Sequence, residues 1–134
     1  MPLPDIRVAA VAVLRERRLL LVTARGRDVF YLPGGKIEAG ESARAAAVRE
    51  AREEVGLALD PTDLDELFTV VSQAHGEPDG RLVRMTVFAA ETSAEPVAAA
   101  EVDAVHWATT ADADRFPPAG IEVARLLVER GLLD

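Results

Sequence analysis

Short apolar runs alternate with polar turns along the chain, a pattern typical of buried strands rather than of long helices. Runs rich in Val, Leu and Ala predict strands at residues 6–14, 18–24, 29–32, 64–74, 81–91 and 102–108. The segment between the fourth and fifth runs, residues 75–80, is rich in turn-forming residues, so we expect a hairpin there. Residues 92–100, biased toward Ala and Glu, predict a loose surface loop.

Two segments have the features of a helix that covers one face of a sheet. The first runs from about residue 42 to residue 55: the hydroxyl of Ser42 can cap its start, and Gly56 suits a left-handed end. The second runs from about residue 120 to residue 130, with Gly131 as its stop. Strands, helix, hairpin, strand and helix together predict an α/β fold in which a mixed sheet lies between helices.

Composition restricts the class of protein. The 134 residues, 49% of them apolar, suit one compact unit, so we expect residues 1–134 to form a single domain. No apolar run reaches the ~18 residues that a membrane span needs, and the N-terminus lacks a secretion pattern. We therefore expect a cytoplasmic protein without a membrane partner. The lack of cysteine excludes disulfides, thiolate catalysis and zinc–thiolate sites.

The formal net charge of −8 restricts the partners. Such a field repels phosphates, so we expect no long nucleic acid as a partner. A small polyphosphate can still bind if a cation joins it to the acidic side chains.

Three carboxylates lie close together on the first predicted helix. Glu50, Glu53 and Glu54 have the spacing i, i+3 and i+4, which places them within roughly 100° around the axis. At ~6 Å and an effective dielectric constant near 20, each like-charged pair costs about 3 kcal/mol. In open solvent the cost falls to about 0.2–0.5 kcal/mol. The cluster is therefore either the seat of a divalent cation or an ordinary solvated helix face.

The residues before the helix favour the cation. Pro33, Gly34 and Gly35 should end a strand in a loop whose bare backbone can approach a ligand closely. A backbone carbonyl and several carboxylates at one point form the all-oxygen environment that Mg²⁺ prefers, commonly shared with substrate phosphates.

The same stretch resembles a known sequence motif. Residues 35–57, GKIEAGESARAAAVREAREEVGL, match the Nudix box, G-x5-E-x7-R-E-U-x-E-E-x-G-U, in which U is apolar. The fixed positions are filled by Gly35, Glu41, Arg49, Glu50, Glu53, Glu54 and Gly56, and the apolar ones by Ala51 and Leu57. The resemblance extends over essentially the whole chain. Residues 32–38 and 114–119 are similar to MutT-like nucleoside triphosphate pyrophosphohydrolases.

The resemblance implies a Nudix α/β/α sandwich and a hydrolase that cleaves a nucleoside diphosphate linked to a further group X. Water attacks phosphorus, assisted by Mg²⁺, with Mn²⁺ as an alternative. The metal ligands implied are the carboxylates of Glu50, Glu53 and Glu54 and the carbonyl of Gly34. Glu101 stands where several relatives carry an additional acid, although a solvated carboxylate is an equal alternative there.

Further roles in catalysis are also implied by the resemblance. Arg49 occupies the position of a residue that orients the acids, which an ion pair along the helix would permit. The general base varies within the family, and Glu53 and Glu54 are the first candidates for it. We expect replacement of either glutamate by Gln to lower kcat a hundredfold or more.

Four residues are candidates for substrate binding. The ammonium group of Lys36, next to the bare backbone of Gly35, could reach a phosphate oxygen, or it could be a solvated loop lysine. Tyr31 could stack on a base or pack in the core. Arg25 could hold phosphates, or it could lie in a solvated turn.

The substrate class follows mainly by exclusion within the family. Residues 71–73 lack the proline typical of ADP-ribose-cleaving members, and the single tyrosine, Tyr31, does not match that of dinucleoside-polyphosphate hydrolases. The signature of NADH-cleaving members is also missing. This leaves (deoxy)nucleoside triphosphates, without a defined base, because Gly120 replaces an asparagine that can read one. The alternatives are a nucleotide-binding sensor without hydrolysis and, for assembly, either a monomer or a homodimer.

Overall fold

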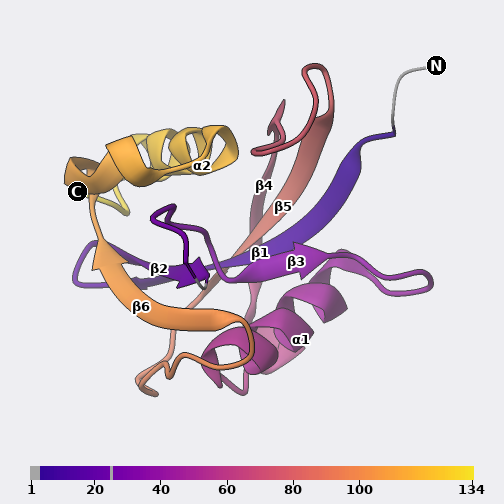
Figure 1. Cartoon of the computed structure of the whole chain (residues 1–134). Coiled ribbons are helices and arrows are strands. Elements are labelled where there is room, and N and C mark those ends of the chain that lie inside the picture. Colours follow the sequence, from indigo (N-terminus) through magenta and orange to yellow (C-terminus); the bar gives the residue numbers. More distant parts are fainter. Residues whose placement is uncertain (1–3, 25) are drawn as a thin grey trace.

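A mixed β-sheet lies between two helices, with α1 on one face and α2 on the other (Figure 1). The computed structural model describes residues 4–24 and 26–134. The strands are β1 (Ile6–Arg15), β2 (Arg18–Ala24), β3 (Gly34–Lys36), β4 (Asp65–Gln73), β5 (Leu82–Ala90) and β6 (Val102–Ala108). The helices are α1 (Ala43–Val55) and α2 (Pro118–Glu129), with short 3₁₀ turns η1 (Pro61–Asp63) and η2 (Thr110–Arg115). The predicted α/β fold with a mixed sheet between helices is confirmed.

The central strand β1 changes partners along its length. The strand order in the sheet is β4-β5-β1-β2-β6, and β1 runs parallel to β5 and antiparallel to β2. Near its start β1 also pairs with β3, from Val8 opposite Lys36 to Ala10 opposite Gly34. It pairs with β2 only near its end, at Leu14 and Leu19. The sheet therefore divides between β3 and β2, and this division opens a cavity on the sheet.

Two apolar clusters fill the spaces between the sheet and the helices. Helix α1 buries Ala46, Ala47, Ala51 and Val55 against one face of the sheet. Helix α2 packs against the other face, with Val123 and Leu127 fully buried. Because alanine is small, the backbone of α1 can lie close to the strands. The acidic side of α1, which carries Glu50, Glu53 and Glu54, therefore lies near β3.

Both ends of α1 are stabilised as the sequence predicts. The hydroxyl oxygen of Ser42 accepts a hydrogen bond from the amide of Ala45 at 3.0 Å. Gly56 adopts the left-handed conformation, with φ of 66°. The helix thus begins and ends within a residue of its predicted limits, and the acids have a defined rotation about its axis.

The prediction of a strand at residues 29–32 is wrong. Only an isolated bridge between Tyr31 and Val22 forms there, and the strand comes later, at β3. The expected loop at Gly34 and Gly35 is therefore a strand. The reason is steric: a side chain on Gly34 would meet the backbone of Ala9 and Ala10, so only bare backbone can pair with β1 at this point.

We expect Gly34→Ala to lower the free energy of unfolding by about 1–3 kcal/mol. The added methyl carbon would lie 2.8 Å from the Cα atom of Ala10, a backbone atom that cannot rotate away. Gly35→Ala is the matched control: its methyl carbon would lie 2.5 Å from a carboxylate oxygen of Glu50, the end of a flexible side chain. Urea denaturation should show the larger loss for Gly34→Ala, and equal losses in the two variants would contradict this account.

No helix in the described ranges 4–24 and 26–134 is long and apolar enough to cross a lipid bilayer.

Candidate active site

The acidic face of α1 lies directly against the glycines of β3. The amide N–H of Gly34 donates a hydrogen bond to Glu54 Oε1 at 2.7 Å. The carboxylate of Glu50 lies so close to Gly35 that no Cβ atom fits between them. The two glycines therefore permit direct contact between the carboxylates and the backbone of the strand.

One guanidinium group holds the acids together. Arg49 donates from Nε and Nη2 to the two carboxylate oxygens of Glu41, at 2.8 and 3.0 Å. Its Nη1 donates to Glu50 at 2.8 Å and to Glu53 at 3.4 Å, and its Nη2 also donates to the carbonyl of Lys36. Arg49 holds the pKa of the Glu41 carboxyl down at about 2. A planar group with five donors can bind several acceptors at once, and here it joins Glu41, Glu50 and Glu53.

Glu54 differs from the other acids of the cluster. Burial, foremost, raises the pKa of its carboxyl to about 7, and the negative charges of Glu50, Glu53 and Glu101 add to the rise. The hydrogen bond from Gly34 opposes it. The raised pKa is therefore mainly an effect of burial, and repulsion among the acids is a smaller contribution.

The donor set suits a hard divalent cation. The carbonyl of Gly34 can add a backbone oxygen to these carboxylates. In the antiparallel ladder between β1 and β3, hydrogen bonds join Val11 to Pro33 and Arg7 to Ile37. Because hydrogen-bonded and non-hydrogen-bonded pairs alternate, the N–H and C=O groups of Gly34 point away from β1. These groups point to the side on which Glu54 lies. Within the part of the chain that the structure describes, no three acidic or histidine side chains already converge on one point. Arg49 and the Gly34 amide hold the acids instead.

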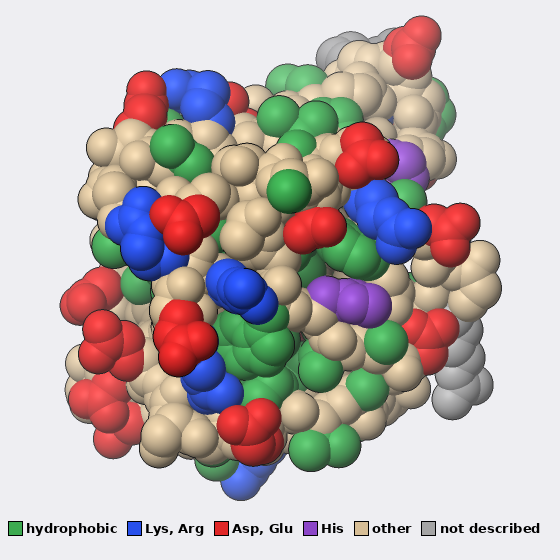
Figure 2. All heavy atoms as spheres, turned by 90° about the vertical axis from the view of Figure 1, so that its left-hand side faces the viewer, with side chains coloured by type: hydrophobic (Ala, Val, Ile, Leu, Met, Phe, Trp, Pro, Cys, Tyr) green, Lys and Arg blue, Asp and Glu red, His purple; other side chains and the backbone are tan. Residues whose placement is uncertain are grey.

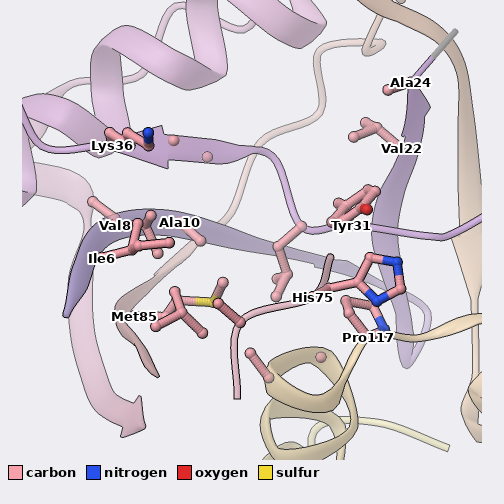
Figure 3. Close-up of a pocket in the computed structure, with 18 of the residues that line it drawn as sticks. Ile6, Val8, Ala10, Val22, Ala24, Tyr31, Lys36, His75, Met85 and Pro117 are labelled. Atoms are coloured by element: carbon pink, nitrogen blue, oxygen red, sulfur yellow. The ribbon is translucent and has the colours of Figure 1, made fainter. Parts of the chain in front are cut away.

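A cavity of about 800 Å³ opens beside the acids, where the sheet divides (Figure 3). Its lining includes the predicted site residues Tyr31, Gly34, Gly35, Lys36, Glu54 and Glu101. Arg49, Glu50 and Glu53 do not line it and lie farther along the acidic face of α1. Arg25, also predicted to bind substrate, lies outside the described residues.

Glu101 reaches the cavity because the loop before it is fastened to α1. The amides of Val97 and Ala99 donate to the carbonyls of Val55 and Glu54, each at 2.9 Å. Ala100 then adopts a left-handed conformation, with φ of 54°, just before Glu101. The loop predicted to be loose has no regular structure, yet its backbone is bound to the C-terminal end of α1.

Sequence reasoning assigned no role to His75, which also lines the cavity. Its ring meets the ring of Tyr31 edge to face, with centroids 6.3 Å apart. Tyr31 is half-buried: it packs against the core and also lines the cavity, and its stacking on a base stays a prediction. A single histidine in a turn has no spacing pattern that could mark it, and only the hairpin geometry brings it to this wall.

We expect the metal-free protein to lose stability as the pH rises from about 4.5 to 7. The folded state binds the Glu54 proton more tightly than the unfolded chain, because its pKa is about 7 instead of 4.5. The resulting stability is complete below the unfolded pKa and is lost as the pH passes through the folded one. It amounts to at most about 3 kcal/mol. Urea denaturation in a chelator measures it, and Glu54→Gln should remove this component; an unchanged slope would contradict it.

The face shown in Figure 2 carries a mixture of acidic and basic side chains. The described residues on that face form no continuous basic patch of the kind that binds a nucleic acid backbone.

Comparisons with known proteins agree with the fold and with the sequence motif. The family model described as NUDIX domain matches residues 4–128. The chain is 26% identical to the CTP pyrophosphohydrolase of Escherichia coli, over 90% of this chain and 88% of that protein. It is 31% identical to YjhB of Bacillus subtilis, provisionally named an ADP-ribose pyrophosphatase, over 87% of this chain but only 53% of that protein.

Among solved structures, the MutT protein of Methanosarcina mazei superposes with a TM-score of 0.78 at 20% identity, covering 98% of each chain. At this identity the likeness supports the fold alone. Together with the family model, which covers most of the chain, these findings place the chain in the Nudix family.

Proposed function

We propose that the protein is a metal-dependent pyrophosphohydrolase that cleaves a (deoxy)nucleoside triphosphate by attack of water on phosphorus. The observation that carries the proposal is the contact between the acidic face of α1 and the bare backbone of β3. This contact borders a cavity of about 800 Å³, a volume in the range of small-molecule sites.

The groups proposed to hold Mg²⁺, or Mn²⁺ in its place, are the carboxylates of Glu50, Glu53 and Glu54 and the carbonyl of Gly34. Glu101 is proposed as a further ligand from the cavity wall. A divalent cation bound there would neutralise phosphate oxygens and lower the pKa of a water molecule.

The remaining roles belong to groups of the chain itself. Arg49 orients Glu50 and Glu53 through its hydrogen bonds. Glu54 is the first candidate for the general base, because it lines the cavity together with Gly34 and Glu101. Glu53 is the second candidate.

Phosphate binding is assigned to Lys36 and to the backbone at Gly35, both in the cavity wall. Tyr31 provides a ring for the base. A phosphate contact from Arg25 stays a prediction.

Two substrate classes have support. The lack of a proline at residues 71–73 and the similarity to the CTP pyrophosphohydrolase favour a nucleoside triphosphate. The similarity to YjhB favours ADP-ribose. We propose the triphosphate class, because the relative with that activity matches this chain over nearly its whole length.

The test is a panel of canonical and oxidised nucleoside triphosphates, ADP-ribose, dinucleoside polyphosphates and sugar nucleotides, assayed with Mg²⁺ and with Mn²⁺. Phosphate and pyrophosphate are quantified separately, because their ratio identifies the phosphorus that is attacked. We expect the highest kcat/KM for a triphosphate, with release of pyrophosphate. A preference for ADP-ribose would replace the proposed substrate class, and nucleotide binding without any turnover would favour a sensor.

A further inference from the structure

One side chain fastens the turn between β4 and β5, residues 74–80. The amide nitrogen of Gln73 donates to the carbonyls of Ala74, Glu77 and Pro78, at 3.2, 3.3 and 3.0 Å. Its amide oxygen accepts from the N–H of Gly80 at 2.9 Å. The side chain thus bridges both ends of the turn.

The hydrogen bonds of Gln73 are directed to this turn and not to the cavity, although Gln73 also lies in the cavity wall. Both amide hydrogens and one acceptor position are used within residues 73–80. Without such contacts a glycine-containing turn of this length would sample several conformations. Gln73 therefore restricts the conformations of residues 74–80 and the positions of their side chains.

The turn carries His75 into the cavity wall, where its ring contacts Tyr31 edge to face, at an interplanar angle of 70°. Figure 3 shows Tyr31, His75 and Pro117 on one side of the cavity and Lys36 on the other. The side chain of Met85 lies between them in this view. The cavity thus has Lys36 on one side and the rings of Tyr31 and His75 on the other.

The aromatic end suits a flat group with a polar edge. Ring faces and apolar side chains favour a planar ligand, and the imidazole of His75 has one nitrogen that donates and one that accepts in its neutral form. Tyr31 and Gly35 are separated by three residues, at most about 14 Å of extended chain. The sugar and phosphates of a nucleotide can span that distance, so a base at Tyr31 and phosphates at Gly35 can belong to one ligand.

We propose that His75 contacts the nucleobase of the substrate and that Gln73 is a positioning residue that holds His75 against Tyr31 through the 74–80 turn. The inference rests on the proposed function for the identity of the substrate. It extends that function by naming the specificity contact.

The first test compares His75→Ala and Gln73→Ala in kinetics with the preferred nucleoside triphosphate. We expect each variant to raise KM about tenfold, because one hydrogen bond or ring contact is lost. The value of kcat should change less than about twofold. Inorganic tripolyphosphate, which has no base, serves as a competitor and should keep its inhibition constant. Val71→Ala, on an exposed position of β4, is the matched control and should leave all constants unchanged.

The second test is the double variant. If Gln73 acts through His75, Gln73→Ala has no further effect on KM in the His75→Ala background. An additive effect would overturn the positioning role. A KM unchanged by His75→Ala, or a parallel weakening of tripolyphosphate, would overturn the base contact.

A third measurement separates this inference from the hydrolytic function. Nucleoside 5′-monophosphates are titrated into the metal-free protein and its His75→Ala variant, a readout that needs no turnover. Weaker binding by about tenfold in the variant would support the base contact even if the protein hydrolyses no triphosphate. Equal binding, or no binding to either protein, would overturn it.

Discussion

Replacement of Glu54 by Gln should lower kcat at least about a hundredfold while the protein stays folded. Glutamine has nearly the same shape, and its amide oxygen can still accept the hydrogen bond from the N–H of Gly34. The change removes the negative charge and the proton-accepting oxygen at the one acid of the cluster whose pKa is near 7. The substitution therefore tests the chemical role of the carboxylate without a large change in packing.

The measurement is kcat at saturating metal and substrate, together with urea denaturation of both proteins. Glu66→Gln, an exposed glutamate of β4, controls for the loss of one charge and should keep normal turnover. In the absence of metal at pH 8, Glu54→Gln should be more stable than the unmodified protein, because a charged carboxylate is no longer buried there and repulsion within the cluster falls. Near-normal turnover would exclude Glu54 as the base and leave Glu53, whose Gln variant is then the decisive one.

Arg49→Lys should lower kcat by about two orders of magnitude and raise the metal concentration needed for half-maximal rate. A lysine ammonium cannot reproduce the paired contacts to both oxygens of Glu41 together with those to Glu50 and to the carbonyl of Lys36. The carboxylates would then lose their fixed orientation, and their mutual repulsion would be less compensated. Because lysine keeps the positive charge, a lower kcat would be due to the changed geometry of the hydrogen bonds to the carboxylates.

Arg52→Lys on the same helix is the matched control, because Arg52 is exposed and, among the described residues, makes no hydrogen bond or ion pair with the acids held by Arg49. Titration of activity against Mg²⁺ for both variants distinguishes orientation from general electrostatics. If Arg52→Lys shifted the metal dependence as much as Arg49→Lys does, the orienting role would be rejected.

The parts of the site that follow from local sequence were predictable. The cap at Ser42, the left-handed Gly56 and the spacing of Glu50, Glu53 and Glu54 together define a helix with one acidic face, and the structure has that helix. The position of Arg49 in the motif predicts an orienting role, which stays a prediction; the structure shows its hydrogen bonds to Glu41 and Glu50. Such features depend on residues at most a few turns apart.

The parts that depend on contacts between distant segments were not predictable. Strand β3 forms because bare backbone can approach β1, a condition that the apolar pattern does not record. His75 enters the cavity because Gln73 fastens a turn that lies far from Tyr31 in sequence. Glu101 has a defined place because Ala99 binds the end of α1. In each case the two partners are far apart in sequence, so no local pattern records their contact.

The parallel pairing of β1 with β5 also has a consequence for how the chain folds. Val8 at the start of the sheet pairs with Met85, so the central strands meet only after a long loop has closed. Contacts of such high sequence separation slow folding, because the entropy of loop closure is lost before the contacts form. During synthesis on the ribosome the sheet cannot be completed before β5 has emerged. Until then the apolar strand β1 lacks its central partner and is the segment most exposed to aggregation.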